Sequence, residues 1–268
     1  MHASPGPVAN ISALFPSLPL PDRPAAAAEA GFTAIETWWP FAAPAPVGRE
    51  ADDFVDAVRA AGVELVALNF FHTAPGAGGA GILSHPGRSA EFRDNLDAVH
   101  HLARQLDVRL FCAPYGHRLD TLSDQEQRET AVLRLTEANR TLSAVGGRTM
   151  IEPLSGIPGF PLTTARQAAA IIRRVDAAAG DGPSTGLLAD LYHLAANGAD
   201  LEADLASYTY LIAHVQIADH PGRGEPGTGT LAIGWHIETL LRHGYRGRFA
   251  LEYQPSGPVR RSALPRHR

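Results

Sequence analysis

The chain contains almost no cysteine. Cys112 is the only one among 268 residues, so no disulfide can form within the chain, and a cysteine-rich zinc site is excluded. Cys112 lies in the apolar run Leu110–Ala113. Free cysteine behaves as a small hydrophobe in such surroundings, so we interpret Cys112 as a core residue.

Long apolar runs and a basic surface are missing as well. No apolar stretch approaches the ~20 residues that cross a bilayer, and residues 1–10 lack the basic region and apolar stretch of a signal peptide. The net charge of −5 argues against a nucleic-acid binder, and the basic tail at 260–268 is interpreted as a solvated terminus. We therefore expect a cytoplasmic protein with a small-molecule substrate and no nucleic-acid or membrane partner. A homo-oligomer is compatible with the sequence.

Short apolar runs alternate with alanine-rich amphipathic stretches along the chain. This alternation is typical of βα units and a parallel sheet. The expected strands are Val8–Leu14, Ala34–Trp39, Glu64–Phe71, Arg109–Tyr115, Arg148–Leu154, Gly186–Tyr192, Ala213–Ala218 and Arg248–Tyr253. The clearest expected helices are Arg49–Ala61, Ser89–Leu106, Ser123–Val145, Thr163–Ala178 and Ile233–His243.

The residues at the expected helix ends agree with these boundaries. Glycine stands just past several helices, where a left-handed residue commonly ends a helix, as in Ala61-Gly62 and His243-Gly244. Ser123 is followed three positions later by Glu126, which is a capping-box pattern. Thr163 or Thr164 is placed to cap the next helix.

Eight expected strands with no linker predict one (β/α)8 TIM barrel over residues 1–268. The length suits one barrel of ~250 residues, although a doubly wound open sheet is a competing architecture. Segments rich in proline and glycine, Ala74–Gly81 and Pro221–Gly229, follow expected strands, where barrel loops form the catalytic face. Only Gln254–Arg268 follows the last strand, and its three prolines oppose a regular helix. The eighth helix is therefore expected to be short or missing.

Polar side chains stand late in four consecutive expected strands. They are Glu152, Asp190, Gln216 and Glu252. Burying a carboxylate without a partner is costly, and lysine and arginine are scarce in these strands, so a cation is a suitable partner. Oxygen ligands favour Mg²⁺ or Mn²⁺, and barrel strands direct such residues to one mouth. One such residue alone is more often bonded to backbone, but four together predict a site for one divalent metal ion.

At these residues the chain resembles the hydroxypyruvate isomerase family of xylose isomerase-like TIM barrels. The resemblance extends to about Pro255. Its blocks are Ala9–Ser12, Ala26–Phe32, Ala34–Glu36, Pro86–Arg88, Glu91–Arg93, Ile151–Leu154, Asp190–His193, His214–Asp219, Pro221–Arg223, Glu225–Gly229 and Leu251–Tyr253.

The resemblance implies roles for individual residues. It implies that the four strand-end residues bind the metal ion and that Glu152 and Glu252 also act as the acid–base pair. It implies that His193 and Arg223 hold the substrate, and that Asn69 and Asn10 line the pocket. On sequence alone, a surface arginine and a structural histidine are the competing interpretations for Arg223 and His193.

The chain departs from the family pattern at four places. Ser155 stands where the family usually has Asn, and Thr230 stands where it usually has Glu. The loop after Asn69 differs, and the C-terminal helix is shortened. Because the expected metal ligands are intact, these departures bear on the substrate more than on the type of reaction.

Several functions use this barrel. The leading hypothesis is an aldose–ketose isomerase that converts hydroxypyruvate to 2-hydroxy-3-oxopropanoate through an enediolate. The alternatives are a 2-oxo-tetronate isomerase and a ketose 3-epimerase. A metal-dependent apurinic endonuclease would need more histidines and a basic DNA-binding face. A metabolite-binding barrel without catalysis would have no use for two carboxylates beside a metal ion.

Overall fold

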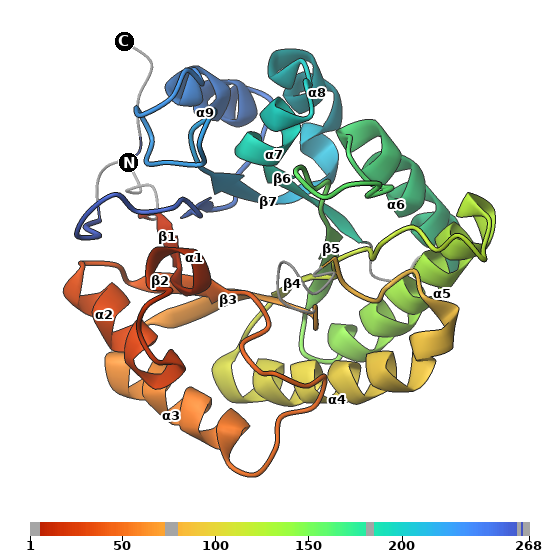
Figure 1. Ribbon diagram of the computed structural model, residues 1–268, viewed down its shortest axis with the longest axis horizontal. Coiled ribbons are helices and arrows are strands. Elements are labelled where there is room, and N and C mark those ends of the chain that lie inside the picture. Colours follow the sequence, from red (N-terminus) through yellow and green to blue (C-terminus); the bar gives the residue numbers. More distant parts are fainter. Residues whose placement is uncertain (1–5, 73–79, 181–184, 262–263, 265–268) are drawn as a thin grey trace.

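Eight parallel strands close into a barrel in which neighbours along the chain are neighbours in space (Figure 1). This computed structural model describes residues 6–72, 80–180, 185–261 and 264. The strands are β1 (Val8–Asn10), β2 (Ala34–Thr37), β3 (Glu64–Asn69), β4 (Leu110–Cys112), β5 (Arg148–Ile151), β6 (Gly186–Asp190), β7 (Ile212–Ile217) and β8 (Phe249–Leu251). β8 pairs with β1, so the predicted TIM barrel is confirmed and the open sheet is excluded.

Helices surround the barrel on the outside (Figure 1). They are α1 (Ile11–Leu14), α2 (Arg23–Glu29), α3 (Glu50–Ala61), α4 (Ser89–Leu106), α5 (Asp124–Ser143), α6 (Ala165–Ala179), α7 (Leu191–Ala196), α8 (Leu201–Tyr208) and α9 (Ile233–Arg242). Short 3-10 turns are η1 (Leu20–Asp22), η2 (Pro86–Arg88) and η3 (Thr209–Leu211). The five helices expected from the sequence are α3, α4, α5, α6 and α9. Ser123 and Thr164 both cap through capping boxes.

Most of the expected strands extend beyond the observed ones, and in β1 and β6 the reason is helix capping. The Asn10 side chain accepts hydrogen bonds from the backbone of Ser12 and Ala13, so β1 stops and α1 begins. The Asp190 side chain does the same for Tyr192 and His193 at the start of α7. These caps start helices at apolar residues that would otherwise favour a strand. They also hold the side chains of Asn10 and Asp190 at the strand ends.

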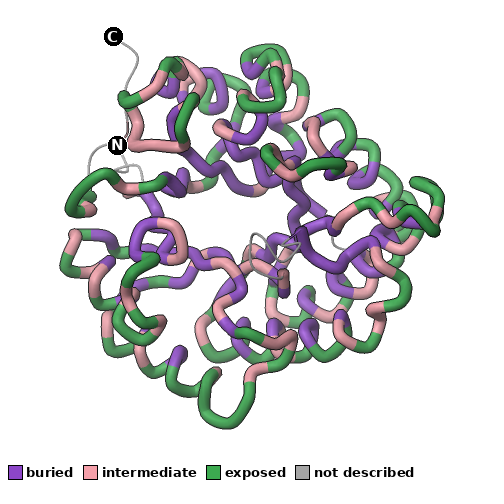
Figure 2. Tube along the Cα trace, viewed as in Figure 1, coloured by how far each residue is buried: buried purple, intermediate pink, exposed green. Residues whose placement is uncertain are grey.

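The apolar core has three parts. Side chains between the strands and the helices form the largest one, and Figure 2 shows the barrel strands buried and the outward sides of the helices exposed. Two small clusters come from the strands, one formed by Ala67, Cys112, Met150 and Leu188 and the other by Val8, Ala34 and Ala250. Cys112 is a buried free cysteine, as expected.

The structure describes only part of two segments that the sequence analysis singled out, the segment after β8 and the loop after β3. No helix follows β8 within residues 252–261, in keeping with a short or missing eighth helix, while residues 262–263 and 265–268 lie outside the described residues. Most of the expected loop Ala74–Gly81 also lies outside them. None of the helices formed by the described residues is long and apolar enough to cross a membrane.

Candidate active site

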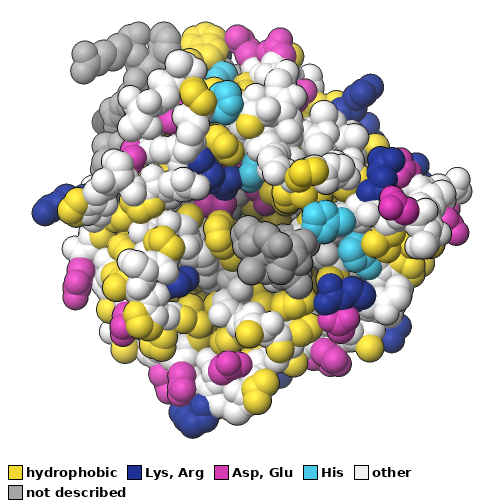
Figure 3. Space-filling model, viewed as in Figure 1, with side chains coloured by type: hydrophobic (Ala, Val, Ile, Leu, Met, Phe, Trp, Pro, Cys, Tyr) yellow, Lys and Arg dark blue, Asp and Glu magenta, His cyan; other side chains and the backbone are white. Residues whose placement is uncertain are grey.

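A pocket of about 730 Å³ opens at the carboxyl ends of the strands. Its wall includes a residue at the end of, or in the segment after, each of the eight strands. In Figure 3, acidic, basic and histidine side chains meet in the hollow at the centre of this face. One such lining residue for each strand, in chain order, is Ser12, Trp38, Asn69, Pro114, Glu152, His193, Arg223 and Glu252.

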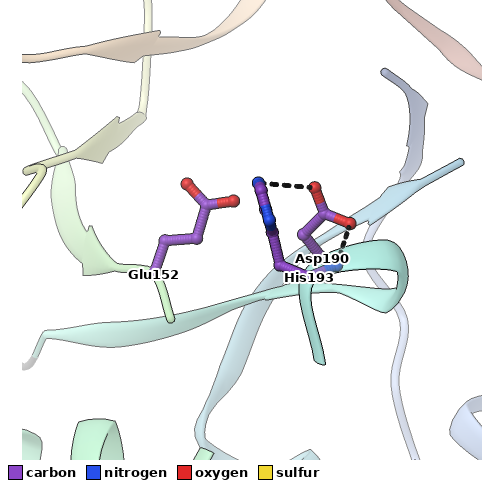
Figure 4. A group of neighbouring side chains, drawn as sticks. All are labelled: Glu152, Asp190 and His193. Carbon is purple, nitrogen blue, oxygen red and sulfur yellow. Dashed lines mark hydrogen bonds and ion pairs between the residues drawn. The ribbon is translucent and has the colours of Figure 1, made fainter. Parts of the chain in front are cut away.

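The structure brings the four strand-end residues together. Oxygen atoms of Glu152 and Asp190 lie within 4.8 Å of each other and of a His193 ring nitrogen (Figure 4). Gln216 Nε2 lies 2.5 Å from Glu252 Oε2. All four are buried, with between 1% and 8% of their surface exposed. Arg223 joins the two pairs, because it contacts both Asp190 and Glu252. The four oxygen-bearing side chains thus form one connected, buried group at the ends of consecutive strands, and their role as metal ligands stays a prediction.

Burial and mutual repulsion alter the acidity of two of the carboxyls. Burial raises the pKa of Glu252 to about 8, although Arg223 opposes the rise and Asp190 adds to it. Burial raises the pKa of Glu152 well above its usual range, and the charges of Glu252 and Asp190 add to this effect. A pKa of about 8 suits Glu252 to proton transfer near neutral pH. Repulsion between the ionised forms of the carboxyls also favours a bound cation.

Arg223 already supplies one positive charge to this cluster. Its Nη2 donates to Asp190 Oδ2 over 3.1 Å and also to Glu252 Oε1. Its guanidinium carbon lies 5.0 Å from the centre of the Tyr192 ring. The side chain that supplies this positive charge lies in the loop after β7 and not in a strand. Part of the carboxylate charge is therefore compensated by the protein itself, which the sequence did not indicate.

His193 is held by Ser155, one of the residues that depart from the family pattern. The Ser155 backbone N–H lies 3.1 Å from His193 Nδ1, and the Ser155 hydroxyl lies 2.8 Å from it. On the other side of the ring, Nε2 lies 2.6 Å from Arg223 Nη1 and 3.7 Å from Asp190 Oδ2. Burial lowers the pKa of His193 to about 4, so the ring is neutral at pH 7. Its place beside Glu152 and Asp190 makes it a candidate metal ligand as well as the expected substrate contact.

The two asparagines lie in different places. Asn69 ends β3 and lines the pocket. Asn10 is 1% exposed and is not among the residues that line the pocket. Its Nδ2 donates to Glu252 Oε2 over 2.7 Å. Asn10 therefore contacts a candidate catalytic carboxylate directly.

Glu36 and His214 are two buried residues that the sequence reasoning missed. Glu36 Oε2 lies 2.5 Å from His214 Nε2, and both residues are at most 2% exposed. A signal was present, since each is a polar residue inside an apolar run, but the pairing joins β2 to β7 across the barrel. Spacing along the chain does not show such a contact.

The donor atoms at the site fit a hard divalent ion. Among the described residues, Glu152 Oε1 and Gln216 Oε1 are buried and accept no hydrogen bond. Such orphaned oxygen atoms are rare in proteins. With the Asp190 and Glu252 carboxylates they give the oxygen-rich set that Mg²⁺ and Mn²⁺ prefer.

A network of backbone hydrogen bonds to Asp219 shapes the loop that carries Arg223. The buried carboxylate accepts from His220 N at 2.9 Å, Gly227 N at 2.7 Å and Leu231 N at 3.0 Å. Arg223 itself has a φ of 56°, a left-handed conformation that is uncommon for non-glycine residues. The loop therefore depends on an acceptor at position 219.

Asp219→Asn is expected to loosen this loop. An amide NH2 would replace one acceptor oxygen and face a backbone N–H, leaving a buried donor unsatisfied at a cost of ~1–3 kcal/mol. We expect a lower unfolding temperature and a higher KM, because Arg223 loses its fixed position. Thermal unfolding and steady-state kinetics measure both. An unchanged KM in a destabilised variant would show that the loop does not position Arg223.

Together these features define a class of enzyme: a closed parallel barrel with a buried carboxylate cluster at its carboxyl-end mouth. Comparison with known proteins identifies the family within this class. The family model of the xylose isomerase-like TIM barrel matches residues 24–266. A solved structure named as an AP endonuclease of family 2 from Brucella melitensis is 30% identical, has a TM-score of 0.83 and is matched over 95% of each chain.

Curated relatives narrow the assignment. A Streptomyces coelicolor protein with the provisional name hydroxypyruvate isomerase is 42% identical over 92% of this chain and 89% of its own. The Escherichia coli hydroxypyruvate isomerase is 29% identical over 92% of both chains. The 2-oxo-tetronate isomerase of Pectobacterium atrosepticum is 29% identical over 93% of this chain and 92% of its own. The chain belongs to the hydroxypyruvate isomerase family of xylose isomerase-like TIM barrels, and it is an isomerase.

Proposed function

We propose that the chain is a metal-dependent aldose–ketose isomerase that converts hydroxypyruvate to 2-hydroxy-3-oxopropanoate. The observation that carries this proposal is the meeting of Glu152, Asp190, Gln216 and Glu252 in one buried place at the pocket. The names of the curated relatives support the choice of substrate.

The reaction moves a carbonyl group between adjacent carbons. A carboxylate removes a proton from the hydroxymethyl carbon of hydroxypyruvate, which leaves an enediolate, and the proton returns to the neighbouring carbon while a second proton passes between the two oxygens. Glu152 and Glu252 are the candidates for these transfers, because both carboxyls are buried at the wall of the pocket, and burial raises the pKa of each.

The four strand-end residues are the candidate ligands of the metal ion, with His193 as a further one. A bound Mg²⁺ or Mn²⁺ supplies Lewis-acid stabilisation of charge on neighbouring oxygens. Arg223 and His193 face the same pocket. The guanidinium suits a substrate carboxylate, and the neutral imidazole hydrogen-bonds a substrate oxygen without adding charge.

Proton transfer can be followed directly by NMR in D₂O. We expect deuterium to appear on the carbon next to the carbonyl of hydroxypyruvate when enzyme and Mn²⁺ or Mg²⁺ are present. A boiled sample with the same metal is the control for spontaneous exchange. If no candidate acid or sugar incorporates deuterium above this control, the proposed isomerisation is wrong.

A second candidate reaction is the isomerisation of a four-carbon 2-oxo acid. The pocket of about 730 Å³ has room for a substrate of this size, since pockets of ~300–1,000 Å³ hold drug-sized ligands. A relative named 2-oxo-tetronate isomerase has this chain length of substrate. The NMR series therefore includes a 2-oxo-tetronate and a ketose. Inversion at C3 of the ketose would indicate a 3-epimerase instead.

A further inference from the structure

Glu36 is a buried carboxylate to which the proposed reaction assigns no step. It lies on β2, is 2% exposed and is absent from the pocket wall. Its Oε1 accepts from Asn10 Nδ2 at 2.9 Å and from Gln216 Nε2 at 2.7 Å. Its Oε2 lies 2.5 Å from His214 Nε2, which donates because the carboxylate accepts. Glu36 is thus fully hydrogen-bonded inside the barrel.

The same two amides also reach Glu252. Asn10 Nδ2 donates to Glu252 Oε2 over 2.7 Å, and Gln216 Nε2 lies 2.5 Å from that oxygen. Two amide groups therefore bridge Glu36 and Glu252. The orientation of Asn10 is fixed independently, because its Oδ1 caps α1 by accepting from Ser12 and Ala13. Only its NH2 group is left to face the carboxylates.

The bridge determines which end of the Gln216 amide faces Glu36. A carboxylate that is already bonded to a ring N–H offers only acceptor atoms, so the Gln216 NH2 group must point toward Glu36. The amide oxygen is then turned away from Glu36. Among the described residues, this oxygen is buried and accepts no hydrogen bond. Glu36 and Glu252 both accept from this NH2 group, so loss of Glu36 removes one of the two acceptors that oppose rotation of the amide. Rotation would exchange oxygen for nitrogen, and an amide nitrogen is not a ligand for a hard cation.

We propose that Glu36, held in place by His214, is a positioning residue that fixes the Gln216 amide with its oxygen available to the divalent ion. Glu36 itself touches neither substrate nor metal ion. This inference rests on the proposed function, because it requires a metal ion at the strand-end residues. Residues beyond a metal's own ligands commonly act in this way.

Binding of Mn²⁺ alone to the metal-free protein tests the inference without any need for activity. Calorimetric titration of Glu36→Gln is expected to give a Kd about 10–100-fold higher than that of the wild-type protein. Glu64→Gln is the matched control, because it makes the same chemical change on β3 at an exposed residue that pairs with Arg248. The control is expected to keep the wild-type Kd. The unfolding temperature of each metal-free variant reports any general loss of stability.

A double-mutant cycle separates positioning from a merely structural role. If Glu36 acts through Gln216, then adding Glu36→Gln to Gln216→Ala should weaken Mn²⁺ binding little beyond Gln216→Ala alone. Independent effects would add instead. Should Glu36→Gln fail to fold, the paired variant Glu36→Gln with His214→Gln removes the carboxylate together with its ring partner and takes its place in the cycle.

The outcomes distinguish the two proposals. Wild-type Mn²⁺ binding with an equal Kd for the Glu36 variant, or additive effects in the cycle, overturns the positioning role and leaves the proposed function intact. Absence of Mn²⁺ binding by the wild-type protein overturns the metal site, and the positioning role falls with it.

Discussion

Glu152→Gln and Glu252→Gln are each expected to abolish deuterium incorporation into the substrate, with a loss of at least ~10²–10⁴-fold. Glutamine has nearly the same shape as glutamate but cannot accept and return a proton at neutral pH. The two carboxyls are buried at the pocket, and burial raises the pKa of both, so each is suited to the transfer. The measurement is the initial rate of exchange by NMR in D₂O with saturating Mn²⁺.

A loss of metal binding could also lower the rate in these variants. Mn²⁺ titration of each variant therefore accompanies the exchange measurement, so that the rate is compared at full occupancy. Glu64→Gln, with its exposed side chain, serves again as the matched control. If either active-site variant keeps near-normal exchange at full occupancy, its assignment to the acid–base pair is wrong.

Removal of divalent metal is expected to stop the reaction completely, and addition of Mn²⁺ or Mg²⁺ is expected to restore it. The crowding of carboxyls at the site is the physical reason to expect a bound cation. Arg223 is bonded to Asp190 and Glu252, but Glu152 Oε1 accepts no hydrogen bond among the described residues. A ligand that binds only the folded state also stabilises it. We therefore expect the unfolding temperature to rise with Mn²⁺ concentration.

The measurement is activity after treatment with EDTA and its removal, followed by stepwise return of each metal ion. Elemental analysis of the treated protein gives the residual metal content. Zinc and calcium returned in the same way show whether the site selects among divalent ions. Full activity in protein that retains almost no metal would contradict the proposed chemistry.

The sequence was sufficient to predict the barrel and the convergence of its strand-end residues. Alternating apolar runs located all eight strands, and the pairing of β8 with β1 in the structure then decides between the barrel and the open sheet. Because a parallel barrel brings every carboxyl end to one mouth, the positions of Glu152, Asp190, Gln216 and Glu252 could be anticipated from their places late in four strands.

The contacts that the sequence did not predict are those between distant segments. Glu36 and His214 meet across the barrel although 178 positions separate them. The pairing of Arg223 with Asp190 and Glu252 depends on the path of a loop held by Asp219, which local propensity does not describe. The short helices α1 and α7 were missed because their capping residues, Asn10 and Asp190, look in sequence like polar residues within a strand.

The central claim is that one divalent ion lies among the side chains of Glu152, Asp190, Gln216 and Glu252. Anomalous diffraction from a crystal grown with Mn²⁺, collected near the manganese absorption edge, locates such an ion directly. We expect one strong peak within bonding distance, ~2.0–2.2 Å, of oxygen atoms from these residues. A peak elsewhere on the protein, or none at the strand ends despite measured Mn²⁺ binding, would contradict this account.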